Sequence, residues 1–146
     1  MSDTLDEYKD DFGLFIEAGF VAAKQMDEKS ARQIFKAAQV LNPESVSPQV
    51  GLGYIALNKM DTKESDRIFE KVVEKEPENW LAVCFLGVSY VLQKEKRKEG
   101  EELILKALEG TDDETVRTLA KTSLEWNEKD LKKKDSKAPF FKKNES

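Results

Sequence analysis

The sequence predicts an all-α protein built from repeated pairs of antiparallel helices. Four independent series of landmark residues recur at the same interval of 34 positions. The series are Gly19, Gly53 and Gly87; Phe12, Val46 and Trp80; Phe35 and Phe69; and Pro43 and Pro77. The apolar residues between these landmarks follow the three-and-four spacing of a helix face. One helix pair cannot bury its apolar face alone, so we expect each unit to stack on its neighbours.

The composition agrees with a helical chain that has few turns. The 146 residues are 39% hydrophobic and 36% charged, with 7 glycines and 4 prolines. The sequence contains no apolar run of about 18 residues, which a transmembrane helix would need, and its first eleven residues are acidic. We therefore expect neither a membrane span nor a secretory signal, and we expect a cytoplasmic protein.

Residue types that most catalytic and metal sites use are scarce. The chain has no histidine and a single cysteine, Cys84, which lies in an apolar run where a small buried side chain is expected. Zinc-ligand sets, Ser-His or Cys-His nucleophile pairs and internal disulfides are therefore excluded. A glycine-rich phosphate loop is also missing from the sequence. We expect no enzyme, no bound metal and no cofactor.

Charge is distributed unevenly along the chain. The net charge is −5, but residues 126–146 hold seven Lys against four acids and therefore carry +3, which leaves −8 for residues 1–125. An acidic body disfavours nucleic acid as a partner, since phosphate binding needs a basic face. We interpret residues 135–146 as a flexible Lys-rich tail, in which Phe140 and Phe141 form either a short docking motif or no specific contact.

The first unit is expected to hold two helices. The capping-box spacing of Thr4 and Glu7 predicts a helix over residues 4–25, with a start near Asp11 as the alternative. A turn over 26–29 precedes a second helix over 30–41. Pro43 ends this helix, because the residue before a proline is displaced from helical geometry.

The second and third units repeat this arrangement. Asp61 and Glu64 form a second capping-box pair, and Asn79 is placed to cap a helix that begins at Trp80. The turn over 93–98 is expected to be one residue longer than its counterparts, which brings Gly100, Ile104 and Ala107 onto the packing face. The helix ends at Gly110, and a further capping box, Thr111 with Glu114, precedes a final helix over 113–133.

The three units resemble tetratricopeptide repeats. Gly19, Gly53 and Gly87 occupy the family's tightest packing place, whereas the family's tyrosine appears only as Tyr90 and the third unit lacks its proline. The resemblance implies repeats at 12–45, 46–79 and 80–112 in a right-handed solenoid, closed by a C-terminal capping helix at 113–133. One tetratricopeptide-repeat domain would then cover residues 1–134.

The resemblance also implies a concave groove lined by the first helix of each repeat. Nearly all the residues carried over to this groove are apolar, which predicts a site for an amphipathic helix or an extended apolar segment, unless the chain's own terminal segments cover it. The expected binding residues are Ile16, Phe20, Ala23, Val50, Tyr54, Leu57, Leu81, Cys84, Val88 and Val91. The cations with which related domains grip the carboxylate tail of heat-shock chaperones are missing from this set.

A small acidic chain with these features resembles the bacterial type III secretion chaperones that are built from tetratricopeptide repeats. The needle-subunit branch fits better than the translocator branch. The resemblance implies a cytoplasmic chaperone that binds an amphipathic helix of a secreted subunit and prevents premature polymerisation, with a small helical co-chaperone as a possible third chain. The alternative is a tetratricopeptide-repeat adaptor that joins folded proteins in a complex.

Overall fold

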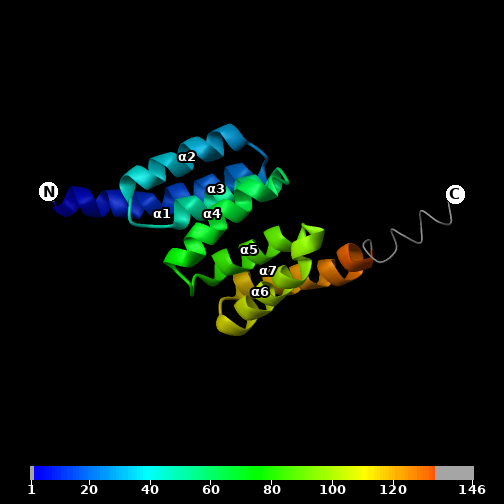
Figure 1. Ribbon diagram of the computed structural model, residues 1–146. Helices are drawn as coiled ribbons and strands as arrows, with labels where there is room; N and C mark the ends of the chain where they lie inside the picture. Colours follow the sequence, from blue (N-terminus) through cyan, green and yellow to red (C-terminus); the bar gives the residue numbers. More distant parts are fainter. Residues whose placement is uncertain (1, 134–146) are drawn as a thin grey trace. The chain divides into compact units, whose positions relative to one another are not determined.

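The computed structural model describes residues 2–133, and it describes the side chains of residues 11–133. Within this range the chain forms helices and no strands, so the predicted all-α class is confirmed (Figure 1). The helices are α1 (Ser2–Lys24), α2 (Glu28–Leu41), α3 (Ser47–Asn58), α4 (Thr62–Lys75), α5 (Trp80–Val91), α6 (Arg97–Gly110) and α7 (Glu114–Trp126). A 3₁₀ turn, η1 (Lys94–Lys96), precedes α6, and a π turn, η2 (Asn127–Leu131), follows α7. The predicted tail, 135–146, lies outside the described residues.

The chain divides into two compact units at the Val72–Val73 bond. The first unit contains α1, α2, α3 and most of α4, and the second contains the end of α4 with α5, α6 and α7. In the first unit α1 contacts both α2 and α3, and in the second α5 contacts both α6 and α7. The single domain expected over residues 1–134 stays a prediction.

Glycines bring the helices of the first unit together around two buried phenylalanines. Gly19 of α1 and Gly51 of α3 both lie against the ring of Phe35, which has no exposed surface. Gly53 lies in the same way against Phe69, which is equally buried. A Cβ at Gly19 would stand 2.6 Å from Phe35, and one at Gly53 would stand 2.5 Å from Phe69. The repeated glycines and phenylalanines of the sequence are therefore partners in packing, and both pairs have the same separation along the chain.

Two turns of the first unit have the same backbone geometry and occupy equivalent places in the sequence repeat. Met26 and Met60 have left-handed φ values of 63° and 59°. The backbone N–H of the aspartate after each methionine donates a hydrogen bond to a carbonyl of the preceding helix. Asp27 donates to Ala22 and Asp61 donates to Ala56, with a nitrogen–oxygen distance of 2.9 Å in both cases. The carboxylates of Asp27 and Asp61 then cap α2 and α4 by accepting from backbone N–H groups three residues later. Because Asp27 is the cap, α2 begins at Glu28 rather than at the predicted residue 30.

Replacement of Met26 or Met60 by glycine is expected to raise the free energy of unfolding by about 1 kcal/mol at each position. A side chain costs energy in left-handed geometry, and these two side chains are 68% and 63% exposed, so little packing is lost. Urea unfolding measures the change. Lys36→Gly, at an exposed interior position of α2, is the control and should lower the stability by about the same amount. Equal losses at all three positions would contradict the explanation.

Other predicted helix boundaries can be compared directly with the structure. Helix α1 begins at Ser2, so the early start is confirmed and the alternative start near Asp11 is wrong. Asn42 ends α2 before Pro43, as predicted. The side chain of Asn79 caps α5 by accepting from the Ala82 N–H at 3.1 Å, also as predicted.

The third turn differs from the first two, as its sequence predicts. Residues 94–96 form the 3₁₀ turn η1, and α6 begins at Arg97. Gly100, Ile104 and Ala107 are buried, which confirms the predicted shift of one residue. Gly87 therefore packs against Ile104. The separation between Gly87 and Ile104 along the chain is one residue longer than the separation between each glycine and its phenylalanine in the first unit. Gly87 and Gly100 also bring the backbones of α5 and α6 into close contact, because a Cβ on Gly100 would lie 2.6 Å from the Gly87 carbonyl oxygen.

The predicted capping box at the start of α7 is wrong. Asp113 is the cap, and its Oδ1 accepts from the Val116 N–H at 3.0 Å. The Thr111 hydroxyl instead accepts from the Asp113 N–H at 3.1 Å. The Arg117 guanidinium donates to the Leu108 and Thr111 carbonyls, at 2.6 and 3.2 Å, and so holds the loop before the helix. Glu114 becomes the first residue of the helix, where it cannot complete a box with Thr111.

Candidate functional site

Three of the predicted groove residues come together in the first unit. Phe20 of α1 and Tyr54 of α3 have ring centroids 5.7 Å apart, with an interplanar angle of 52°. Phe20 also forms a T-shaped pair with buried Phe35, with ring centroids 5.2 Å apart and an interplanar angle of 78°. Ile16 packs against the same core. Ile16, Phe20 and Tyr54 are only partly buried, so they keep some apolar surface in contact with solvent.

Helix packing determines where these rings lie. Gly19 and Gly53 immediately precede Phe20 and Tyr54, and both glycines are buried against phenylalanine rings. The helix faces that carry the glycines are therefore fixed by packing, and the residue after each glycine lies about 100° further around its helix. Phe20 and Tyr54 consequently lie at the margin of the core, where aromatic rings combine buried and accessible area.

The other groove residues of the first unit belong to the core. Ala23, Val50 and Leu57 are 3%, 3% and 9% exposed. Ala23 lies in the same cluster as Phe35, and its carbonyl accepts a 3.2 Å hydrogen bond from the Asn58 side chain. Side chains that are buried to this degree offer little contact area of their own to a partner.

The four groove residues of the second unit divide in the same way. Leu81 and Val88 are partly buried and pack against a core cluster, whereas Cys84 and Val91 have no exposed surface. Burial raises the pKa of the Cys84 thiol to about 12, because the thiolate would lose its solvation. The thiol is therefore neutral near pH 7, and the predicted role of Cys84 as a small buried hydrophobe is confirmed. Leu81 and Val88 are left as the accessible candidates in this unit.

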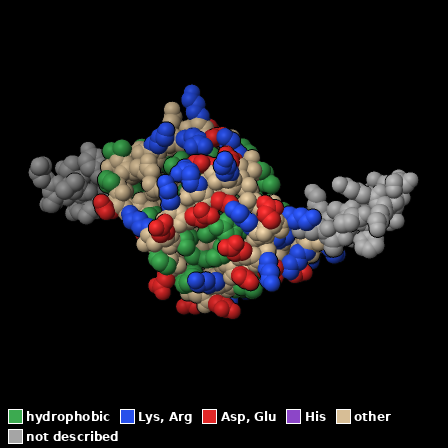
Figure 2. All heavy atoms as spheres, in the orientation of Figure 1, with side chains coloured by type: hydrophobic (Ala, Val, Ile, Leu, Met, Phe, Trp, Pro, Cys, Tyr) green, Lys and Arg blue, Asp and Glu red, His purple; other side chains and the backbone are tan. Residues whose placement is uncertain are grey.

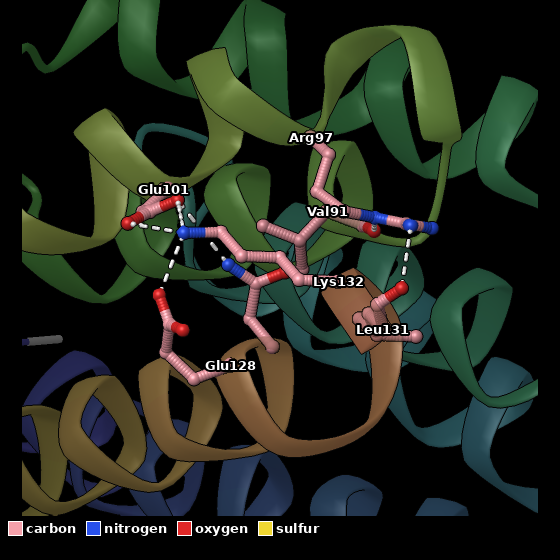
Figure 3. A network of polar contacts seen from close by, with 7 residues as sticks. Val91, Arg97, Glu101, Glu128, Leu131 and Lys132 are labelled. Carbon is pink, nitrogen blue, oxygen red and sulfur yellow. Dashed lines mark hydrogen bonds and ion pairs between the residues drawn. The ribbon is translucent and has the colours of Figure 1, made fainter. Parts of the chain in front are cut away.

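Sequence reasoning missed a polar network in the second unit (Figure 3). The Arg97 guanidinium donates through Nε to the Val91 carbonyl at 2.7 Å and through Nη1 to the Leu131 carbonyl at 3.0 Å. It thereby joins the end of α5 to the π turn η2. In the sequence Arg97 is one of several basic residues of the predicted turn over 93–98, which by themselves would be assigned to the surface.

Lys132 extends this network toward α6. Its Nζ lies 2.9 Å from a Glu101 carboxylate oxygen and 2.7 Å from one of Glu128 (Figure 3). The hydrogen bond to Glu128, followed by the one to Glu101, raises the pKa of the Lys132 ammonium. Fully buried Asn127 donates to Glu101 at 3.4 Å. These contacts hold the segment after α7 in place, and we assign them a structural role.

Charged and hydrophobic side chains are mixed over the rest of the surface in view, and Figure 2 shows basic and acidic side chains with hydrophobic side chains between them. Among residues 11–133, whose side chains the structure describes, no group of three or more acidic or cysteine side chains is arranged to hold a metal ion. Within residues 2–133, no helix combines the length and the hydrophobicity that crossing a membrane would require. Neither the protein-family models nor the curated proteins include a match to this chain.

Proposed function

We propose that the helix pairs α1–α2, α3–α4 and α5–α6 are three tetratricopeptide repeats, with α7 as the capping helix. The observation that supports this assignment is that packing and turn geometry recur with the same period as the sequence landmarks. Gly19 with Phe35 and Gly53 with Phe69 pack alike, and the turns at Met26 and Met60 have the same geometry. The third pair keeps the close glycine contact, but Ile104 replaces the phenylalanine and the turn between the helices is longer.

We further propose that the protein is a cytoplasmic chaperone that binds an amphipathic helix of a secreted type III subunit, in the needle branch. The carrying observation is the partly exposed pair of rings, Phe20 and Tyr54, positioned on a rigid glycine-packed core. Aromatic anchors of this kind commonly dominate the affinity of an interface for an apolar helix face. Ile16 would add apolar contact area beside these rings, and Leu81 and Val88 offer such area within the second unit.

The direct test is purification of the tagged full chain from its native host, with mass spectrometry and sizing of the recovered complex. A small secreted helical subunit at one copy per chaperone, with or without a small helical third chain, is the expected result. Recovery of large folded assemblies alone would favour the adaptor function. Co-expression with the recovered subunit provides a second test, because a chaperone keeps a self-polymerising subunit soluble and monomeric.

Tyr54→Glu is expected to weaken binding of the recovered subunit at least about tenfold, because a carboxylate replaces an apolar ring at the anchor. Isothermal titration calorimetry measures the affinity, and circular dichroism checks that the helices remain. The control is Val40→Glu, which introduces the same charge on α2 in place of an apolar side chain that is 80% exposed. Unchanged affinity in the folded Tyr54→Glu protein would rule out the aromatic pair as the anchor. Loss of helicity would assign Tyr54 to the core, and Phe20→Ser would then test the same surface.

A further inference from the structure

Helix α1 carries a second apolar surface that faces solvent. Its packed side includes Phe12, Gly19 and Ala23, which are buried or partly buried. The opposite side carries Leu14, Ala18 and Val21, and together with Phe15 at their edge these residues form what we call the outer stripe. Leu14 is 63% exposed, Phe15 38% and Val21 53%. Among the other large exposed hydrophobic side chains of the described chain, Val40 belongs to α2, Leu105 to α6 and Met60 to the turn after α3.

The outer stripe has the spacing of a coiled-coil seam. Leu14, Ala18, Val21 and Gln25 follow one another at intervals of four, three and four residues. Charged residues lie beside the seam, with Glu17 and Lys24 seven residues apart on the same flank. Both are exposed, and neither forms a side-chain hydrogen bond or ion pair with residues 11–133, the part of the chain whose side chains the structure describes.

We propose that two copies of this chain pair through the outer stripe, with their α1 helices antiparallel. In the register that fits the residues best, Ala18 of each copy packs against Val21 of the other. Glu17 of each copy then faces Lys24 of the other, which forms two reciprocal ion pairs. Phe15 covers the opposite flank of the seam. Ala18 allows the two helices to approach closely at the centre of the contact.

The distribution of charge along α1 favours pairing with a second copy of the chain in antiparallel orientation. Residues 3–11 contain five acids and one lysine. A parallel pair would place the two acidic segments side by side, whereas the antiparallel pair separates them at opposite ends. The Glu17 and Lys24 flank is complementary to itself only when the helices run in opposite directions. The contact involves one helix face per copy, so we expect a weak dimer, with a dissociation constant in the micromolar range.

Charge exchange provides the sharpest test of this register. Light scattering coupled to size exclusion, with the full chain from about 10 to about 500 µM, should show a monomer–dimer equilibrium. Glu17→Lys and Lys24→Glu should each weaken the dimer at least about tenfold, because every cross-pair then joins like charges. An equimolar mixture of the two variants should restore dimerisation, since both cross-pairs of the mixed dimer are again opposite in charge. In a parallel dimer each charged residue would instead face its own counterpart, so a single substitution would only exchange one like-charged pair for another and would not weaken the dimer about tenfold.

Ala18→Glu tests the centre of the seam and should abolish dimerisation over the same concentrations, because each copy would then place a carboxylate against the apolar Val21 of the other. Val40→Glu is the matched control and should leave the dimer unchanged. Circular dichroism of the variants is expected to be unaltered, since the substituted side chains are exposed. A wild-type chain that stays monomeric at about 500 µM, or a dimer unaffected by Ala18→Glu, would overturn the proposal. Neither result bears on the proposed chaperone surface, which uses the other side of α1.

Discussion

Gly100→Ala is expected to lower the free energy of unfolding by about 3 kcal/mol, at the upper end of the usual cost of overpacking. A Cβ at this position would lie 2.6 Å from the Gly87 carbonyl oxygen and 2.7 Å from the Val91 backbone nitrogen. Both neighbours are backbone atoms, so a side-chain rotation cannot relieve the clash and α6 must move away from α5. Urea unfolding followed by the fluorescence of Trp80 and Trp126, both in the second unit, measures the loss.

Gly13→Ala is the matched control, because the same substitution should have the opposite sign there. Nothing lies within 4 Å of a Cβ placed at Gly13, which is exposed within α1. Alanine should raise the free energy of unfolding by about 0.5 to 1 kcal/mol by reducing the entropy of the unfolded chain. A Gly100→Ala protein as stable as Gly13→Ala would show that α5 and α6 do not need close backbone contact.

Arg97→Met should cost about 2 kcal/mol, because it removes donors from the Val91 and Leu131 carbonyls. Methionine preserves much of the aliphatic stem, so the loss reports mainly on the guanidinium. Arg97→Lys should recover only part of it, since one ammonium lacks the fork that reaches both carbonyls. Urea unfolding gives the total change. Hydrogen exchange should become faster at the backbone amides of residues 127–133, which the contact to Leu131 holds in place.

Arg67→Met serves as the control for this substitution. Arg67 pairs with Glu64 one turn earlier on α4, and both side chains are well exposed, at 54% and 40%. An exposed pair of this kind contributes little, so the stability should change by less than about 0.5 kcal/mol. A similar loss from Arg67→Met and Arg97→Met would mean that the contacts of Arg97 have no special structural importance.

The helical architecture was predictable because the sequence repeats its packing rules. Gly19 and Gly53 precede their phenylalanine partners by the same interval, and the second pair lies 34 positions after the first, which is the period of the sequence landmarks. The shift to Ile104 in the third pair was visible as the displaced small residue Gly100. Capping was predictable where one candidate stood alone, as at Asn79. It failed between Thr111 and Asp113, because contacts from Arg117 decide which of two suitable residues starts the helix.

The candidate site was only partly predictable, since helical spacing identifies a face but not how much of it is covered. Phe20 and Tyr54 meet at the margin of a core, whereas Val50 and Val91 carry the same predicted role and are buried. The Arg97 network left no periodic signal, because a long side chain reaches the distant Leu131 carbonyl through the fold and not along one helix. Side-chain reach of this kind depends on tertiary structure.

The close pairing of sequential helices has a consequence for biosynthesis. Within the first unit α1 contacts α2 and α3, and the partners Gly19 with Phe35 and Gly53 with Phe69 are separated by short stretches of chain. Contacts that are so local favour fast folding, and the N-terminal part of a chain generally folds first during synthesis. The first unit is therefore expected to begin to fold while the ribosome is still translating the second, so that Phe20 and Tyr54 are assembled before the chain is released.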